Sequence, residues 1–530
     1  MSNEMNVRMG ILLRLNVCLI FFIAIYISGC KSDTSLVDSE DSTANKIVVN
    51  LNEQHQKIQN FGASDAWTCQ FVGQWPEEKR SQIADWLFST EVDAQGKPKG
   101  IGLSLWRFNI GAGSAAQDNI SDEWRRTPSF LLSKGKYDWN NQPGQLWFVD
   151  AAKQRGVSKL LGFTNSPPIQ FTKNGKAYSS NGEEANVAPE NYLNFATFLI
   201  DVVKAFKARG TSLDYISPFN EPQWDWTGNG QEGSPYKNTE IYAITKIFDS
   251  LLVKENLNSL IQIGEAGKLN YLYEKADKVT RGDQINQFFH IQSPLYLGAL
   301  EKVDRVISGH SYFTSAPVET MRDVRTKVTD AVRKASVPLE FWQSEYCILG
   351  DQEEVKGGGK DTGIVTALYV ARLIHHDLTM ANASAWHWWL AVTAYDYKDG
   401  LIYVDKNKAN GNYEDTKLLW ALGNYSRFIN AGATRVTVSG DNINVNNPKG
   451  LMMSAYVNPG NKELVVVAVN YGDVDLSSFI NVEGAAVDQF KGYLTGPDAD
   501  AKLKPLALVD SNEKVFIPKK SIVTFVGSIK

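Results

Sequence analysis

The sequence predicts a (β/α)₈ barrel joined to a small β-sandwich. From about residue 60 to residue 430, eight short apolar segments alternate with long amphipathic segments, the pattern of parallel strands separated by helices. After residue 430 the apolar period changes from that of a helix to that of a strand. An open doubly wound sheet is disfavoured, because the sequence has no glycine-rich phosphate-type turn after its first strand.

The barrel elements are recognised by their apolar runs. The helix expected at 189–210 has Pro189 in its first turn, one apolar face, and Gly210 where it stops. Segment 363–382 repeats the pattern, and 416–430 supplies a closing helix. The eight strand candidates are 58–64, 102–110, 159–165, 215–220, 261–266, 306–313, 339–346 and 383–391.

The last hundred residues carry strands separated by Gly, Asn and Pro turns. Segment 46–54 has the same alternating character, so we expect it to pair with the C-terminal sheet and to place both chain ends in one accessory domain. The expected division of the chain is 1–30 signal peptide, 31–45 flexible tether, 46–60 N-terminal strand of the sandwich, 61–430 barrel and 431–530 sandwich.

The N-terminus predicts export. Arg14 precedes an apolar run that is too short for a typical membrane-spanning helix. The run ends in Ile27-Ser28-Gly29-Cys30, which resembles the lipobox of bacterial lipoproteins and implies cleavage before Cys30, acylation of its thiol and a membrane-anchored mature chain. The alternative is an ordinary signal peptide with a chance cysteine. Either reading predicts an exported protein, and the first an outer-membrane, cell-surface or periplasmic-face lipoprotein.

Composition excludes several classes of partner. The net charge of −5 gives no reason to expect nucleic acid or an anionic membrane surface. The 14 Trp and 21 Tyr fit either a large aromatic core or a cleft that stacks sugar rings. Cys69 and Cys347 are expected as buried free thiols, although an oxidising compartment would also permit a disulfide between them. The adjacent His375 and His376 cannot chelate a metal as an i, i+4 pair would. We expect no metal, no cofactor and a monomer.

Polar residues end the predicted barrel strands, where the active sites of such barrels lie. Together these side chains would form a circle around one mouth of the barrel. Such a set of carboxylates, amides, an arginine, a histidine, a tyrosine and tryptophans stabilises a fold poorly but suits sugar binding. The residues are Asp65, Arg107, Asn109, Asn165, Asn220, Glu221, Glu265, His310, Tyr312, Glu345, Trp386 and Trp388.

Glu221 and Glu345 carry the predicted chemistry. They end the fourth and seventh strands and so face each other across the barrel mouth. Retaining glycoside hydrolysis needs two carboxyl groups ~5–5.5 Å apart, one acting as acid/base and one as nucleophile. Asn220 can bind the sugar 2-hydroxyl. The structural alternative is a rim glutamate paired with Arg107.

The motifs "QNFGASDAW", "GLSLWRFNIGAG", "NSPP", "SPFNEPQ" and "QSEY", with the split sandwich, resemble glycoside hydrolase family 30 over essentially the whole mature chain. The resemblance implies Glu221 as acid/base, Glu345 as nucleophile, and sugar contacts from Asp65, Arg107, Asn220, Tyr312 and Trp388. It also suggests that Arg107 keeps Glu345 ionised and that Tyr312 orients it. His310 is either a sugar contact or a packed structural residue, Glu265 a sugar contact or a partner behind the site, and Trp67 and Trp224 stacking platforms or rim packing.

Family membership leaves the substrate open. "NEPQWDW" and "QEGSPY" resemble members that cleave inside β-1,6-linked galactan, the side chains of arabinogalactan. The loop after the eighth strand has no Arg for a glucuronate, and Lys398 is a weaker substitute. Endo-β-1,6-galactanase is the expected activity. The alternatives are β-1,6-glucanase, glucuronoxylanase, an exo-acting β-glycosidase, or a non-catalytic surface glycan-binding lipoprotein.

Overall fold

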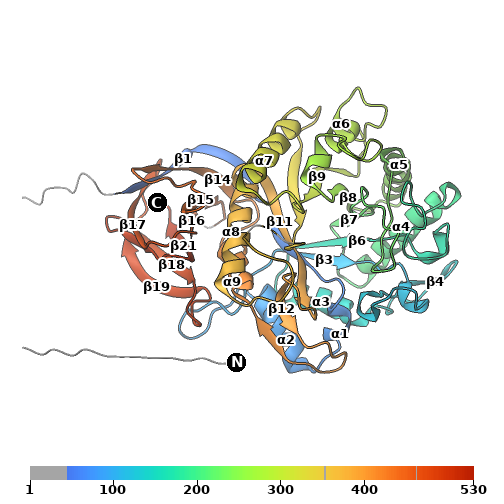
Figure 1. Ribbon diagram of the computed structural model, residues 1–530, viewed down its shortest axis with the longest axis horizontal. Helices are drawn as coiled ribbons and strands as arrows, with labels where there is room; N and C mark the ends of the chain where they lie inside the picture. The colour runs from blue at the N-terminus through green and yellow to red at the C-terminus, as the bar shows by residue number, and fades with distance from the viewer. Residues whose placement is uncertain (1–44, 351, 353, 461) are drawn as a thin grey trace, which may run out of the picture. The chain divides into compact units, whose positions relative to one another are not determined.

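Eight parallel strands close into a barrel in the computed structural model of the protein (Figure 1). The structure describes residues 45–530 apart from 351, 353 and 461. The barrel strands are β2 (Asn60–Ser64), β3 (Leu105–Asn109), β6 (Lys159–Phe163), β7 (Tyr215–Ser217), β8 (Leu260–Ala266), β9 (Val303–His310), β10 (Glu340–Glu345) and β11 (Ala383–Thr393). Each pairs in parallel with its neighbour, and β11 closes the ring by pairing with both β10 and β2. The predicted barrel is confirmed.

A main helix follows each barrel strand. In chain order these are α2 (Glu77–Phe88), α3 (Pro143–Gln154), α4 (Tyr192–Ala208), α5 (Asn238–Lys254), α6 (Gln284–Phe289), α7 (Val318–Arg333), α8 (Ile364–Thr379) and α9 (Lys417–Ser426). Helix α4 buries Phe195, Leu199, Val202 and Phe206 on one face. Gly210 follows it with φ +83°, a left-handed conformation that ends a helix at little cost.

Smaller elements decorate the barrel. They are the short helix α1 (Cys69–Val72), the hairpin of β4 (Leu131–Ser133) and β5 (Lys136–Tyr137), and the strands β12 (Gly400–Val404) and β13 (Tyr413–Asp415). Strand β12 pairs with β11 and extends the barrel sheet beyond the closed ring, which the sequence does not predict. Cys69 and Cys347 are buried free thiols, as expected.

The C-terminal domain is a largely antiparallel sheet in which the N-terminal strand is an interior member. Its members are β1 (Lys46–Lys57), β14 (Thr434–Asp441), β15 (Leu451–Asn458), β16 (Glu463–Asn470), β17 (Leu476–Glu483), β18 (Gln489–Thr495), β19 (Lys504–Asp510), β20 (Val515–Ile517) and β21 (Ser521–Ser528). Strand β1 pairs antiparallel with β14 and parallel with β17. Figure 1 shows β1, in blue, beside the C-terminal strands. The described part of the chain therefore begins and ends in the same domain, as predicted.

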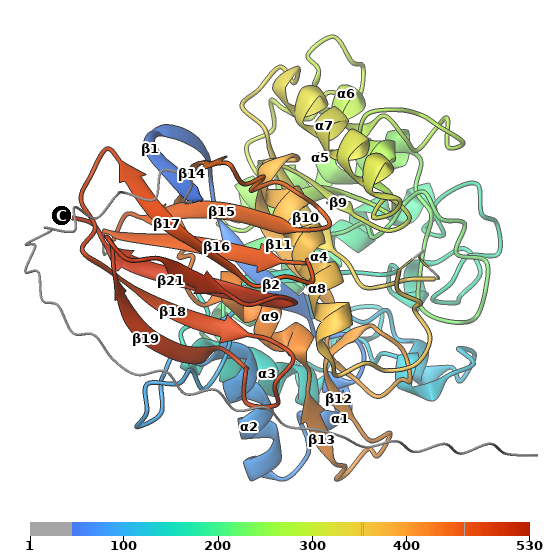
Figure 2. The same ribbon diagram turned by 60° about the vertical axis from the view of Figure 1, so that its left-hand side comes forward.

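The two faces of this sheet serve different cores. Along β16, Leu464, Val466 and Ala468 belong to the core inside the sandwich, whereas the alternating valines belong to the core shared with the barrel. Figure 2 shows β15, β16, β21 and β18 side by side, with α8 and α9 next to them. Between α9 and β21, Asn424 Nδ2 donates to Thr524 Oγ1 at 3.0 Å. The sheet thus packs on the barrel helices through a buried apolar face.

The N-terminal predictions fall outside this part of the chain. The signal peptide, the tether and the lipobox Cys30 lie in residues 1–44, which the structure does not describe. Within the described ranges, no helix combines the length and hydropathy needed to cross a bilayer.

Candidate active site

The carboxyl ends of the barrel strands bring five ionisable side chains together. Arg107 lies in β3 and Glu265 in β8, while His310 and Glu345 end β9 and β10. Glu221 lies just beyond the end of β7. None of the five is more than 6% exposed. We call these five residues the charged cluster.

Arg107 connects the charged cluster to its surroundings. Its Nη1 donates to Glu345 Oε2 at 2.5 Å and to Ser64 Oγ at 3.0 Å. Its Nη2 donates to Glu265 Oε2 at 2.9 Å and to Asn220 Oδ1 at 3.1 Å. Because the guanidinium is planar and rigid, these bonds fix four side chains from different strands relative to one another.

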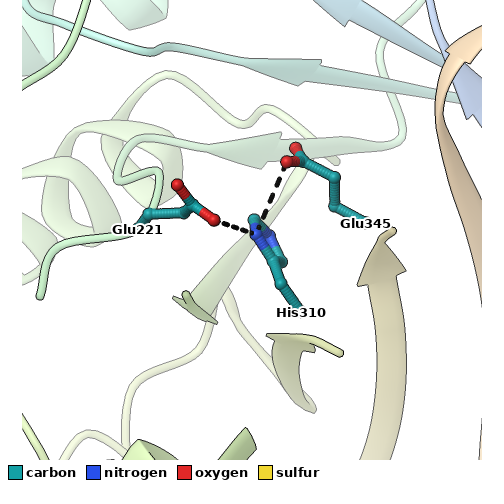
Figure 3. Close-up of side chains that lie close together, drawn as sticks. All are labelled: Glu221, His310 and Glu345. Carbon is teal, nitrogen blue, oxygen red and sulfur yellow. Dashed lines mark hydrogen bonds and ion pairs between the residues drawn. The ribbon is translucent and has the colours of Figure 1, made fainter. Parts of the chain in front are cut away.

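His310 lies between the carboxylates (Figure 3). Its Nδ1 is 2.9 Å from Glu221 Oε1 and 3.6 Å from Glu345 Oε1, and its Nε2 is 2.9 Å from Glu265 Oε2. Burial lowers the pKa of His310, but Glu345, Glu221 and Glu265 outweigh it and raise the pKa to about 10. The ring is therefore an imidazolium that donates on both sides.

Glu221, His310 and Glu345 also have the spacing of a metal site. One carboxylate oxygen of each glutamate and a ring nitrogen all lie within 4.8 Å of one another. A metal ligand, however, must be a neutral imidazole with a free lone pair. Both nitrogens of His310 face carboxylates as donors, so this trio fits an ion network better than a metal centre.

Glu265 and Glu221 differ in how strongly they hold a proton. Burial would raise the pKa of Glu265, but Arg107 and His310 outweigh it and lower the pKa to about 2. For Glu221, burial and the neighbouring Glu345 raise the pKa even though His310 lowers it. Of these two acids, Glu221 is the one whose surroundings favour the protonated form.

Charge balance leads to the same assignment. The charged cluster contains three carboxyl groups and two cations, so one proton on a carboxyl group makes it neutral. Glu265 stays ionised between Arg107 and His310, and Arg107 binds Glu345 at 2.5 Å. The proton therefore belongs on Glu221, because an uncompensated buried charge is costly.

The backbone at Glu221 and Glu265 is held in an unusual conformation. Both residues have φ +45°, and Glu221 N–H donates to Glu265 O at 2.9 Å. Left-handed backbone at a non-glycine residue costs of order 1–3 kcal/mol and is concentrated at functional sites. The strain turns the chain out of β7 and aims the Glu221 carboxyl at His310.

A cavity of about 330 Å³ opens beside Glu221 and Glu345. Tyr312 lies in its wall and donates its hydroxyl to Glu345 Oε1 at 2.9 Å. Its lining residues are Asn220, Glu221, Trp224, Trp226, Gln231, Tyr312, Phe313, Glu345, Cys347, Leu349 and Trp389. The two glutamates of the predicted pair thus share one cavity, and five of its eleven lining side chains are aromatic.

The structure separates the other predicted sugar contacts. Asn220, Tyr312 and Trp224 line the cavity, whereas Arg107, His310 and Asp65 are fully buried and are not among its lining residues. Asp65 Oδ1 accepts from Asn109 N at 2.8 Å, and burial raises the pKa of Asp65 to about 7. Of the readings left open, Glu265 proves a partner of Arg107 and His310 behind the cavity.

The expected position of Trp388 is wrong. Trp388 is fully buried and donates its indole N–H to Asp399 O at 2.7 Å. Its partner on the same strand face, Trp386, donates to Asp377 of α8, so this face of β11 points toward the helices. The next residue, Trp389, lines the cavity, with Trp67 packed edge-on against it at 5.3 Å.

Several lining residues are not predicted from the sequence. Phe313 follows the predicted Tyr312, and Cys347 and Leu349 follow the predicted Glu345 within four residues. Their closeness to strand-end residues is the signal that could have pointed to them. Gln231 lies in the loop after β7, and only that loop's fold brings it to the cavity.

Known proteins share this architecture. The profile of O-glycosyl hydrolase family 30 matches residues 44–403. A structure described as a conserved exported protein from Bacteroides fragilis is 33% identical, with a TM-score of 0.85, covering 91% of this chain and 100% of its own. The catalytic domain of a family 30 xylanase C from Talaromyces cellulolyticus is 20% identical, with a TM-score of 0.66 and coverage of 91% and 100%. An endo-β-1,6-glucanase is 15% identical, with a TM-score of 0.64 and coverage of 91% and 93%.

The barrel, its accessory sheet and the acidic cavity at the strand ends define a glycoside hydrolase. The chain belongs to O-glycosyl hydrolase family 30. The two more distant structures show a shared fold, and their own substrates differ from each other.

Proposed function

We propose that the protein is a retaining endo-β-1,6-galactanase that uses Glu221 as acid/base and Glu345 as nucleophile. The observation that carries the mechanism is the pair of carboxylate oxygens within 4.8 Å of each other beside one cavity. That spacing suits direct attack by one carboxylate, and inverting enzymes instead hold the two groups about 6.5–9.5 Å apart to admit a water.

In the first step Glu345 attacks the anomeric carbon while Glu221 gives its proton to the departing glycosidic oxygen. Arg107 and Tyr312 bind one oxygen each of Glu345, so the nucleophile is held in a fixed orientation with a cation beside it. Asn220, anchored by Arg107 through its Oδ1, keeps its amide N–H groups for the sugar 2-hydroxyl.

The charged cluster remains neutral through this step. Before attack, Glu345 is ionised and Glu221 is protonated. Afterwards Glu345 is an uncharged ester and Glu221 is ionised. His310 faces both glutamates, so the same imidazolium stabilises the negative charge in either place. Glu221 then removes a proton from water, which breaks the ester and releases the sugar with its original configuration.

The substrate assignment rests on the loop after β7. The residues of "NEPQWDW" and "QEGSPY" that resemble galactan-cleaving members include Trp224, Trp226 and Gln231, which line the cavity. The second candidate is β-1,6-glucanase activity, because an endo-β-1,6-glucanase with the same fold acts on the same type of linkage. Glucuronoxylanase, exo-acting glycosidase and binding-only functions are the remaining alternatives.

Product analysis tests the proposal. The chain from residue 31 is incubated separately with de-arabinosylated arabinogalactan, β-1,6-glucan and glucuronoxylan, with Glu345→Gln as the matched control. A ladder of galacto-oligosaccharides from the first polymer, lost in the control, is the expected result. Cleavage of another polymer refutes the substrate, release of monosaccharide alone refutes endo action, and binding without cleavage refutes the enzyme.

We also propose that the protein is exported and anchored through Cys30 as a monomer whose polysaccharide substrate is its sole partner. The lipobox-like sequence supports the anchor, and the related structure from Bacteroides fragilis is described as an exported protein. In cells fed labelled palmitate, the wild type should carry the label and Cys30→Ser should not. Light scattering of the soluble chain tests the monomer.

A further inference from the structure

An exposed aromatic side chain at the cavity has no role in the mechanism above. Phe313 follows Tyr312, is 47% exposed and has φ +58°. The left-handed conformation is a genuine outlier for a bulky residue. Because the ring is about half exposed, its burial contributes little hydrophobic stabilisation to the fold. Burial alone therefore does not account for this placement, whereas a ligand that covers the ring would.

The neighbours of Phe313 hold it in place. Its ring is 6.0 Å from that of Trp224 at an interplanar angle of 82°. Lys268 Nζ lies 5.3 Å from the Trp224 ring, 5.6 Å from Phe313 and 5.6 Å from Tyr271. Among the described residues, no carboxylate forms an ion pair with Lys268. Its ammonium group instead makes cation–π contacts with the rings of Trp224, Tyr271 and Phe313, and these contacts fix the orientation of the rings relative to one another.

Trp224 is positioned as firmly. A Cβ on Gly267 would lie 2.4 Å from Trp224 Nε1, so only glycine lets the indole rest on this backbone. The backbone N–H of Trp224 donates to Glu221 O at 3.1 Å. Phe313, Trp224 and Leu349, which is 39% exposed, line the same cavity as the two glutamates. We call Trp224 and Phe313 the aromatic rim.

We infer that the aromatic rim, oriented by Lys268, is the subsite that binds the sugar ring on the leaving-group side of the cleaved bond. This inference rests on the proposed function. The proton donor Glu221 must face the departing oxygen, and the rim joins Glu221 through Trp224. Trp389, packed among Trp67 and Phe163, lies at the part of the cavity near Arg107, where the sugar bonded to Glu345 belongs. The ligand is a pyranose whose C–H-rich face stacks on aromatic carbon.

A trapped glycosyl-enzyme separates this subsite from the chemistry. The wild type is inactivated with 2-deoxy-2-fluoro-β-galactosyl fluoride, or with its gluco epimer, and freed of excess reagent. Recovery of activity is then followed in buffer alone and with rising concentrations of a disaccharide acceptor. Water can attack the glycosyl-enzyme without binding in the leaving-group subsite, whereas the acceptor must bind there before it attacks.

For Phe313→Ala and for Trp224→Ala, the acceptor concentration that gives half-maximal recovery should be about two- to tenfold higher than for the wild type. Each recovery is measured relative to that of the same protein in buffer alone. Lys268→Met, which keeps the apolar stem, should shift it in the same direction by less. Phe516→Ala is the matched control, because Phe516 is 51% exposed on β20. An unchanged acceptor dependence in Phe313→Ala overturns the inference, as does an equal loss of recovery in water.

A second measurement covers failure of the mechanism itself. If neither fluoride labels the protein, the retaining mechanism is refuted while the subsite is still testable. Calorimetry then compares oligosaccharide binding to Glu345→Gln with and without Phe313→Ala. A two- to tenfold weaker affinity supports the subsite, and equal affinity overturns it.

Discussion

Replacing His310 with Asn removes the cation between Glu221 and Glu345. The Asn amide can still place an N–H near the position of Nδ1, so the variant removes charge with little change in shape. Because a neighbouring cation lowers the pKa of a carboxyl group, its loss should raise the pKa of Glu221 further. Glu221 would then stay protonated, and able to act as the acid, to higher pH.

The size of the effect follows from the contact distance. His310 Nδ1 is 2.9 Å from Glu221 Oε1, and two unit charges about 4 Å apart interact by about 4 kcal/mol at an effective dielectric constant near 20. At 1.36 kcal/mol per pH unit this is about three units. The remaining amide dipole offsets part of it, so we expect the alkaline limb of the rate profile to move up by about 1–3 units.

The assay is the pH dependence of kcat/KM between pH 4 and pH 11. The alkaline limb reports the acid that must be protonated in the free enzyme. His290→Asn is the matched control, since His290 follows α6 outside the charged cluster. An alkaline limb that stays in place, or moves to lower pH, refutes the role given to His310.

Stability gives an independent check on the same charge. The folded-state pKa of His310 is about 10, above its ordinary 6.5, so its contribution to stability is complete below pH 6.5 and is lost as pH rises through about 10. The difference in unfolding free energy between wild type and His310→Asn should shrink over that interval. A constant difference would mean that His310 is not charged in the folded protein.

Three further outcomes are expected. Tyr312→Phe removes the hydrogen bond that orients Glu345 and should lower kcat about 10- to 100-fold, equivalent to about 1.4–2.7 kcal/mol; an unchanged kcat contradicts its orienting role. Trp389→Ala should lower kcat/KM more than Trp388→Phe, which should mainly lower the melting temperature because a buried carbonyl loses its donor; the reverse order would restore Trp388 to the cavity. For Asp65, the folded pKa of about 7 lies above its ordinary value, so its contribution to stability is lost as pH rises from about 4 to about 7; Glu232 and Asp399 have pKa values raised in the same way, so Asp65→Asn should lessen the fall in stability, measured by denaturant unfolding, without removing it, and an unchanged fall would show that Asp65 does not contribute.

The sequence predicts the architecture well, because the barrel depends on repeated local patterns. Each strand and helix carries its own apolar period, and their order places Glu221 and Glu345 across one mouth. The N-terminal strand is also recognisable, since its alternation matches the C-terminal strands rather than the barrel. These conclusions need only the chain order of the elements.

Side-chain direction at the strand ends is harder to predict. In "WHWW", residues 386–389, aromatic side chains occupy both faces of β11, so composition cannot say which face points inward. The pairing of β11 with β2 also shifts register between Trp388 and Leu390, which disrupts simple alternation where the strand meets the cavity. The roles of Glu265 and His310 depend likewise on where the Arg107 donors point, and no local pattern records that.

The position of β1 in the sheet determines when this strand can fold during synthesis of the chain. This strand lies between β14 and β17, yet β14 begins only at Thr434. At about 5–20 residues per second, a ribosome needs on the order of 20–80 s to make the intervening chain. Throughout that interval the apolar residues of β1 have no partner strand and are exposed to chaperones or aggregation. The sandwich can close only when both ends of the chain are present, so a protein truncated at its C-terminus should leave its N-terminal strand unfolded as well.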